Sequence, residues 1–160
     1  MSKVYLSIGS NKGNRSVLIN KAIDEIEKKV GKIISRSSIY QSKSWGFDSN
    51  DFYNLCLLID TDIMPKSLLI NLKKIEKSMG REDIDGSYSD RFIDIDILFY
   101  DNIITDLEDL KIPHPKIEIR KFVLVPMLEI ADDYVHPILN KTIKELDNDC
   151  SDQDIPLKII

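Results

Sequence analysis

The sequence predicts an α+β fold of the ferredoxin-like type, a sandwich in which helices pack on an antiparallel sheet. Two observations predict it. Alternating or continuous apolar segments indicate four strands, and apolar residues at helical spacing indicate two helices between them. Their order is strand, helix, strand, strand, helix, strand, which is the β-α-β-β-α-β core of that fold. We expect residues 1–160 to form a single domain, because this length suffices for one hydrophobic core.

The first three elements lie before residue 43. Apolar and polar residues alternate over residues 3–9, which is typical of a half-buried strand. A turn-forming segment follows, and apolar residues at every fourth position then predict a helix over residues 18–30, with Gly31 as its cap. Residues 33–42 are predicted to form the second strand.

The second half of the core begins with an apolar, β-branched strand over residues 54–63. Pro65 is suited to the first position of a helix, and the apolar spacing continues that helix to Gly80. A polar loop separates this helix from the fourth predicted strand, residues 92–100.

The C-terminal part is expected to add three elements to this core. They are a short strand near residues 103–104, a helix over residues 122–130 and a last helix near residues 142–146. The chain shows no internal repeat and no low-complexity segment, so we expect no second domain within it.

Composition and charge exclude several classes of function. Lys and Arg total 22 against 27 Asp and Glu, a formal net charge of −5, so the chain lacks the basic face that nucleic-acid binding requires. No apolar run is long enough to span a bilayer, and the first residues do not resemble a signal peptide. The two cysteines have no metal-site spacing. We therefore expect a cytoplasmic monomer that acts on small molecules and binds neither nucleic acid nor membrane.

The fourth predicted strand carries the most informative pair of residues. Asp94 and Asp96 point to the same face of the strand, about 7 Å apart, because side chains alternate along a strand. Carboxylates at this spacing can ligate neighbouring Mg²⁺ ions, which could clamp the attacking and leaving oxygens of a phosphoryl transfer. The alternative is a solvated strand face with ordinary acidic residues.

Two arginines bracket the polar loop before this strand. Arg81 and Arg91 lie at its two ends, and the arginine fork matches the geometry of phosphate oxygens. They could therefore contact a triphosphate. The alternative is a pair of surface arginines that neutralise nearby acidic residues.

A histidine between two prolines is a further candidate. Pro113 and Pro115 restrict the backbone on either side of His114, which presents the imidazole in a fixed direction. His114 could donate a hydrogen bond to a phosphate or ribose oxygen. The alternative is a loop histidine without a role.

Several aromatic residues fall outside the apolar periodicity. Trp45, Phe52 and Phe122 have no place in the core pattern, and flat ligands are held by stacking between such rings. Asn54 offers both a donor and an acceptor, as the edge of a heterocycle requires. The alternative is that these rings cover the core.

Together these segments resemble the 6-hydroxymethyl-7,8-dihydropterin pyrophosphokinase family. The resemblance covers most of the chain, from Val4 to about Pro137. The matching segments occur in the family's order and are Ile8-Gly9-Ser10-Asn11, Phe52-Tyr53-Asn54, Gly80-Arg81, Arg91-x-x-Asp94-x-Asp96, and Pro113-His114-Pro115 followed by Arg120-x-Phe122. The Arg-x-x-Asp-x-Asp segment is the most specific of these.

The resemblance implies transfer of the β,γ-diphosphate of ATP to the hydroxymethyl group of the reduced pterin, which gives AMP and the pterin diphosphate in folate biosynthesis. It implies that ATP is the co-substrate and that two Mg²⁺ ions bind at Asp94 and Asp96. A palm-type nucleotidyltransferase is the alternative enzyme, because it would also place paired aspartates on such a sheet. A ferredoxin-like RNA-binding module is disfavoured by the acidic strand.

The resemblance also assigns individual residues. It implies that Phe52 and Phe122 sandwich the pterin, that Asn54 bonds its edge, and that Ser42 and Trp45 line the pocket. The residues it places around ATP are Glu76, Arg81, Tyr88, Arg91, Ile97, His114 and Arg120. Arg81 and Arg91 would stabilise charge during transfer.

Two positions depart from the family. The segment Ser42-Lys43-Ser44 lacks a proline that many relatives carry, and Pro115 replaces a tyrosine found in some of them. The segment after Asn140 matches the family little.

Overall fold

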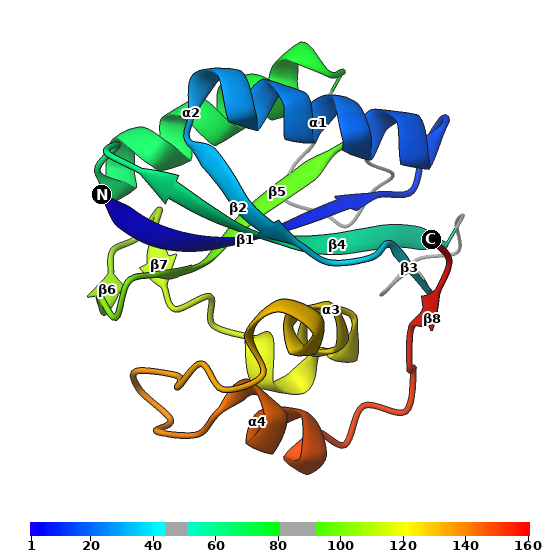
Figure 1. Cartoon of the computed structure of the whole chain (residues 1–160), viewed down its shortest axis with the longest axis vertical. Coiled ribbons are helices and arrows are strands. Elements are labelled where there is room, and N and C mark those ends of the chain that lie inside the picture. Colours follow the sequence, from blue (N-terminus) through cyan, green and yellow to red (C-terminus); the bar gives the residue numbers. More distant parts are fainter. Residues whose placement is uncertain (44–50, 81–91) are drawn as a thin grey trace.

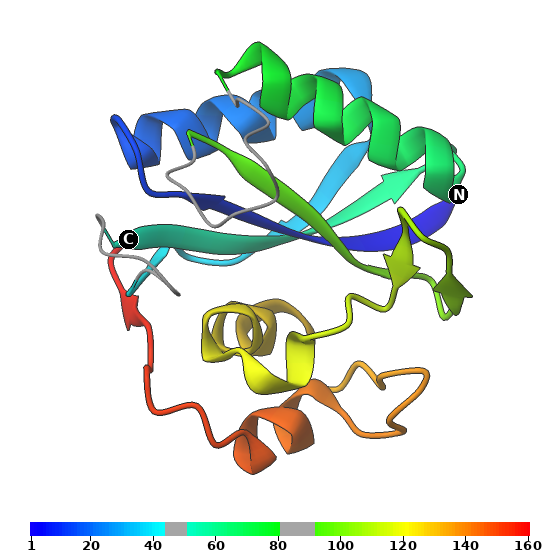
Figure 2. The same ribbon diagram turned by 180° about the vertical axis from the view of Figure 1, so that it is seen from behind.

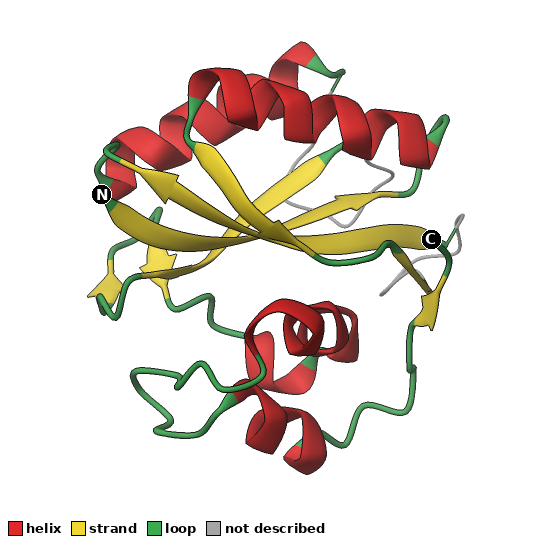
Figure 3. Ribbon diagram, in the orientation of Figure 1, coloured by secondary structure: helices red, strands yellow, loops and turns green. Residues whose placement is uncertain are grey.

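The computed structural model describes residues 1–43, 51–80 and 92–160 of the chain. An antiparallel sheet lies at its centre, and helices pack on both of its faces (Figures 1 and 3). The core elements in chain order are β1 Ser2–Ser10, α1 Arg15–Lys29, β2 Lys32–Arg36, β3 Tyr40–Ser42, β4 Phe52–Thr61, α2 Pro65–Ser78 and β5 Asp94–Tyr100.

The strand order confirms the predicted fold class. Within the described residues the order is β5-β1-β4-β3-β8, with β8 formed by Leu157–Lys158, and β2 also pairs with β4. Every pair in this sheet is antiparallel. β1 and β4 therefore form the centre of the sheet, and β5 lies at one edge.

The segment predicted as one strand over residues 33–42 forms two strands. The pairing of β2 with β4 shifts register between Ile33 and Ser35. After β2, Ser37 exchanges bonds with Cys56 of β4: its amide donates to the Cys56 carbonyl at 2.9 Å, and its hydroxyl accepts from the Cys56 amide at 2.9 Å. A side chain thus replaces a backbone group in the ladder, which separates β2 from β3.

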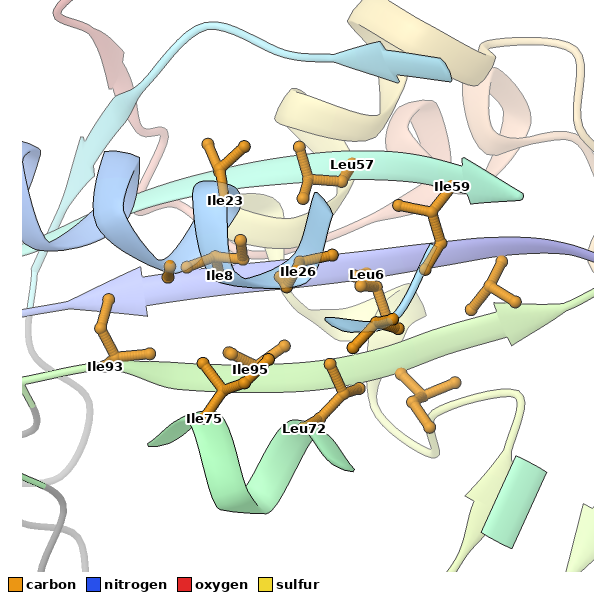
Figure 4. Packing of buried hydrophobic residues seen from close by; sticks show 14 of the residues in the cluster. Leu6, Ile8, Ile23, Ile26, Leu57, Ile59, Leu72, Ile75, Ile93 and Ile95 are labelled. Atoms are coloured by element: carbon orange, nitrogen blue, oxygen red, sulfur yellow. The ribbon is translucent and has the colours of Figure 1, made fainter. Parts of the chain in front are cut away.

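One face of the sheet packs against α1 and α2. Figure 4 shows Ile95 of β5 beside Ile75 and Leu72 of α2, with Ile93 just before β5 in the same apolar layer. These four side chains are all buried. Because side chains alternate along a strand, Asp94 and Asp96 point to the other face of the sheet.

The other face packs against the C-terminal helices (Figures 1 and 2). They are α3 Lys121–Ala131 and α4 Ile143–Asp149, preceded by a 3₁₀ turn at Ile117–Ile119. Both helices lie close to their predicted positions. A second core fills this layer, with Phe99, Leu124 and Met127 among its fully buried members.

The predicted short strand near residues 103–104 is instead a hairpin slightly farther along the chain. Its strands are β6 Thr105–Asp106 and β7 Lys111–Ile112, which pair with each other and not with the main sheet. Among the described residues, no helix has the length and apolar character needed to cross a membrane.

Candidate active site

The candidate site begins with a row of residues across the sheet. Asp94 of β5 lies opposite Gly9 of β1, and Gly9 lies opposite Asn54 of β4. Adjacent strands are about 5 Å apart, so Asp94 and Asn54 are separated by about 10 Å with Gly9 between them. Asp96 lies opposite Ser7 in a second row on the same face. The register therefore brings together residues from three strands.

Gly9 leaves the middle of the first row without a side chain. A Cβ atom at this position would lie 2.7 Å from Oδ1 of Asn54 and 3.6 Å from Cδ1 of Phe52. The first distance is shorter than any ordinary contact, so only glycine leaves the Asn54 amide where it is. The backbone of Gly9 thus lies between Asp94 and Asn54, with the Asn54 amide and the Phe52 ring next to it, and this row is called the floor below.

The Asn54 side chain is held in one orientation. Its Nδ2 donates to Oγ of Ser42 at 3.0 Å, and both residues are buried. This bond directs the amide group, and Oδ1 faces Gly9. The structure therefore brings together Ser42 and Asn54, two residues predicted to bind the pterin, by a direct contact.

The two predicted stacking residues reach this region from different elements. Phe52 is the first residue of β4 and Phe122 lies in the first turn of α3, and each is partly buried. The guanidinium carbon of Arg120 lies 5.5 Å from the centroid of the Phe122 ring. Arg120 is thus placed beside an aromatic wall at the N-terminal end of α3.

A pocket of about 240 Å³ lies at the edge of the sheet formed by β5. Three predicted residues line it, namely Asp96, Ile97 and His114. Ile95 and Pro115 also line it, and so do Leu69 of α2 and residues 108–111, which were not predicted. No sequence pattern indicates them, because the fold alone brings these separate segments together.

His114 is oriented by its neighbours in the chain and by β5. Its amide donates to the carbonyl of Leu98 at 3.0 Å, and its Nδ1 accepts from the amide of Lys116 at 3.4 Å. The neutral imidazole therefore carries its proton on Nε2. Burial lowers the pKa of His114 to about 4, with a further contribution from the positive charge of Arg120, while Asp94 acts in the opposite direction. At neutral pH His114 is a neutral hydrogen-bond donor.

Glu76, which is predicted to lie near ATP, is buried beneath β5. It is 3% exposed, and its Oε2 accepts from the amide of Ile95 at 2.8 Å. Ile95 separates Asp94 from Asp96 in β5. Glu76 therefore supports the strand that carries both aspartates.

The paired aspartates fit a divalent cation that has further ligands from elsewhere. No group of three or more His, Cys, Asp or Glu side chains gathers in residues 1–43, 51–80 and 92–160. Mg²⁺ in phosphoryl-transfer sites is commonly held by one or two carboxylates together with substrate phosphates and water. Asp94 and Asp96 provide such a carboxylate pair.

Four predicted site residues lie outside the described residues. They are Trp45, Arg81, Tyr88 and Arg91. The described chain resumes at Phe92, two residues before Asp94, and ends at Gly80 on the other side of that gap.

A family model and several known proteins are similar to this chain. A family model described as 7,8-dihydro-6-hydroxymethylpterin-pyrophosphokinase (HPPK) matches residues 5–132. The chain is 42% identical over 146 residues to the 2-amino-4-hydroxy-6-hydroxymethyldihydropteridine pyrophosphokinase of Aquifex aeolicus, covering 91% of this chain and 90% of that protein. It is 34% identical over 142 residues to the protein of that name from Porphyromonas gingivalis.

Longer proteins contain a region similar to this chain. The chain is 40% identical to the folic acid synthesis protein fol1 of Pneumocystis carinii, of which it spans 20%. A crystal structure of HPPK-DHPS in complex with substrates superimposes with a TM-score of 0.76 at 19% identity, covering 92% of this chain and 43% of that one. The HPPK-DHPS of Plasmodium falciparum gives a TM-score of 0.74. These structures share the fold.

Proposed function

The chain belongs to the 7,8-dihydro-6-hydroxymethylpterin-pyrophosphokinase family, and from this premise we propose that it transfers the β,γ-diphosphate of ATP to 6-hydroxymethyl-7,8-dihydropterin. The products are AMP and the pterin diphosphate, an intermediate of folate biosynthesis. One observation carries the proposal for this site: the row Asp94, Gly9, Asn54 places a carboxylate and an amide on either side of a residue without a side chain.

The geometry supports two subsites that meet at the paired aspartates. The pocket at β5, lined by Asp96, Ile97 and His114, would take ATP. The floor between Asp94 and Asn54 would take the pterin. A donor and acceptor at its edge and the backbone of Gly9 beneath suit a flat, polar heterocycle.

The walls of the pterin subsite would come from the two phenylalanines. Phe52 and Phe122 would stack on the ring, since aromatic faces hold flat ligands by burial of apolar area. Asn54 would bond the edge of the heterocycle, and Ser42 would hold the Asn54 amide in place. Trp45 is proposed for this pocket from its position in the sequence alone.

The residues of the ATP subsite would hold the nucleotide by a neutral hydrogen-bond donor and by positive charge. Nε2 of His114 would donate to a phosphate or ribose oxygen, and Arg120 would add a positive charge at the same side. Arg81 and Arg91, proposed from the sequence, would neutralise charge that develops as the diphosphate moves. Tyr88 is proposed to contact ATP, also from the sequence.

Asp94 and Asp96 would hold two Mg²⁺ ions. When bound, Mg²⁺ supplies positive charge that stabilises the phosphates and orients the attacking and leaving oxygens. Asp94, opposite Gly9, would also border both subsites, and its carboxylate would accept the proton of the hydroxymethyl group. The oxygen of the hydroxymethyl group would form a bond to the β-phosphorus, and the bond from that phosphorus to the AMP oxygen would break. Positioning of the two substrates would provide most of the rate enhancement.

Product analysis tests the proposal. Purified protein with ATP, Mg²⁺ and the reduced pterin alcohol should form AMP, and omission of the pterin should abolish AMP formation. A palm-type nucleotidyltransferase would release pyrophosphate in place of AMP, and none of the relatives described above supports that alternative. Pyrophosphate release, or AMP formation independent of the pterin, would contradict the proposal.

Variants of the paired aspartates test whether these residues bind the metal ions. Asp94→Asn and Asp96→Asn should each fold and lose turnover by at least about 100-fold, because each removes a metal-binding charge worth several kcal/mol in the transition state. Asp24→Asn on the exposed face of α1 is the matched control and should retain turnover. Near-normal activity in either site variant would exclude the aspartates as metal ligands.

We also propose that the chain acts as a monomer in the cytoplasm. Both cysteines are free, which suits a reducing compartment. Sedimentation of the purified protein would test the monomer, since a stable dimer would contradict it.

A further inference from the structure

The last ten residues cross from α4 to the far edge of the sheet. This segment, residues 151–160, is called the strap below and is red in Figures 1 and 2. It ends in β8, which pairs with β3 so that Gln41 lies opposite Leu157. The ladder continues from Ile39, whose amide donates to the carbonyl of Ile160 at 3.0 Å. The family model matches residues 5–132, so the strap lies outside the matched region.

The strap contacts the helix that carries Phe122. Oδ2 of Asp152 accepts from the amide of Lys121, the first residue of α3, at 3.1 Å. The residue that precedes α3, Arg120, makes no side-chain cap bond to it. A helix N-terminus has amides without helical partners and favours negative charge. Asp152 therefore caps α3 from a distant part of the chain and fixes the turn that contains Phe122.

The strap also contacts the strand that carries Ser42. Oδ2 of Asp154 accepts from the amide of Lys43 at 3.3 Å. Lys43 follows Ser42 directly, and Ser42 is the residue whose hydroxyl accepts from Asn54. The second strap carboxylate thus holds the end of β3 next to the Ser42–Asn54 pair.

Asp152 and Asp154 are linked to each other. The amide of Asp154 donates to Oδ1 of Asp152 at 3.0 Å, so the two carboxylates belong to one tight turn. One carboxylate fixes the Phe122 side of the pterin subsite and the other fixes the Ser42 side. These two sides come from separate elements, α3 and β3, which the strap connects.

We propose that Asp152 and Asp154 are positioning residues that set the spacing of the pterin subsite and so its affinity for the reduced pterin. The inference rests on the function proposed above. The ATP pocket at β5 lies at the opposite edge of the sheet from β3 and β8, so the strap acts more strongly on pterin binding than on nucleotide binding. Arg120, which precedes the capped residue Lys121, is the ATP-subsite residue next to the strap contact.

A strap that only stabilises the fold would give a different result in binding experiments. If it only stabilised the fold, its variants would lower the melting temperature and weaken both substrates by similar factors. If the strap positions the pterin subsite, its variants should weaken pterin binding much more than ATP binding, because only the pterin is proposed to lie between α3 and β3. The split between pterin affinity and ATP affinity is therefore the decisive measurement.

The test uses the full chain with Asp152→Ala, Asp154→Ala and the double variant. Calorimetry measures the Kd of the reduced pterin alcohol with a non-hydrolysable Mg²⁺–ATP analogue present, and the Kd of the analogue itself. The double variant should weaken pterin binding by about tenfold or more, the scale of one lost charge-assisted hydrogen bond, and should change the Kd of the analogue less than about twofold. Asp154→Asn, which keeps an oxygen acceptor, should restore much of the pterin affinity lost in Asp154→Ala.

Asp149→Ala is the matched control. Asp149 is an acidic residue just before the strap, and its carboxylate pairs at 2.7 Å with the amine of exposed Lys141. This variant should bind both ligands as the wild type does. Unchanged pterin affinity in the double variant, or equal losses for pterin and nucleotide, would overturn the positioning role. A wild-type chain that binds no pterin would overturn the proposed function and this role with it.

Discussion

The carboxylate of Glu76 accepts a hydrogen bond of 2.8 Å from the amide of Ile95, the residue between Asp94 and Asp96. β5 lies at the end of the strand order, so this amide is bonded by a helix side chain and not by a further strand. Glu76→Ala should lower the free energy of unfolding by about 1.5–3 kcal/mol, because a buried amide loses a charged acceptor. It should also lower turnover by displacing both aspartates. Denaturant unfolding and steady-state kinetics measure the two effects.

Two further variants separate support of β5 from general stability. Glu76→Gln keeps an oxygen acceptor and should recover most of the turnover. Glu27 of α1 makes the corresponding bond to the amide of Ile33 in β2, at 2.6 Å and away from the aspartates. Glu27→Ala should reduce stability without reducing turnover. Equal turnover in Glu76→Ala and Glu27→Ala would show that Glu76 has no influence on the site.

A Gly9→Ala variant tests whether the pterin lies against Gly9 and Asn54. In Gly9→Ala the new methyl group would lie 2.7 Å from Oδ1 of Asn54, so the amide must move. We expect pterin affinity to fall by about tenfold or more, since an edge hydrogen bond is lost, while affinity for the Mg²⁺–ATP analogue is kept. Calorimetry with each ligand measures both values. Pterin binding that tolerates the methyl group would place the ring elsewhere.

Variants of Phe122 test whether an aromatic ring at this position binds the pterin. Phe122→Ala should weaken pterin binding by about tenfold, the scale of a stacking contact of 0.5–1.5 kcal/mol together with lost apolar burial. It should spare metal–ATP, because the partner of the ring is a flat heterocycle and not a phosphate. Phe122→Leu keeps apolar volume without an aromatic face. Its pterin affinity should therefore lie between that of the wild type and that of Phe122→Ala. If Phe122→Ala damaged ATP binding and left the pterin unchanged, the subsites would have to be exchanged.

The paired aspartates were predictable because they depend only on local geometry. Alternation along one strand places Asp94 and Asp96 on the same face, and the structure shows Ile93 and Ile95 buried on the other (Figure 4). Local apolar periodicity likewise explains why the order of the core elements was predicted, apart from the division of residues 33–42 into β2 and β3. Each of these features is encoded within a window of a few residues.

Contacts between distant segments were not predictable from the pattern. Asp154 and Lys43 are separated by 111 positions, and Asp152 and Lys121 by 31. Nothing in the composition of the strap distinguishes these acids from solvated ones. The role of Glu76 was missed for the same reason, because its partner is a backbone amide that only the docking of α2 against β5 brings within reach.

The histidine of the ATP subsite should not titrate near neutrality. Burial lowers the pKa of His114 to about 4 from an ordinary value of 6.5. Between those values the unfolded chain binds more protons, so the stabilising contribution is present above pH 6.5 and is lost as pH falls toward 4. The imidazole resonances of His114 in NMR should therefore stay constant from about pH 6 to 8. His114→Gln should flatten the dependence of stability on pH within that acidic window, and a titration of His114 near 6.5 would contradict the assignment.

The two substrates should bind in a coupled manner, because Asp94 borders both subsites. A ring placed on the pterin floor removes water from the carboxylate of Asp94, and desolvating the negative charge of a carboxylate is unfavourable. Once Mg²⁺–ATP is bound at Asp94 and Asp96, that charge is compensated and the pterin no longer meets this cost. Metal–ATP should therefore strengthen pterin binding.

Calorimetry of the pterin alcohol with and without the non-hydrolysable Mg²⁺–ATP analogue measures this coupling. We expect the analogue to tighten pterin binding by about 1–3 kcal/mol, which is about 5- to 150-fold. The effect must be reciprocal, so the pterin should tighten binding of the analogue by the same factor. Asp94→Asn removes the charge from the boundary between the subsites. In that variant the pterin should bind the free protein more tightly than it binds the wild type, and most of the coupling should disappear. Equal pterin affinity in the two wild-type titrations would show that the subsites are independent, and Asp94 would then belong to the metals alone.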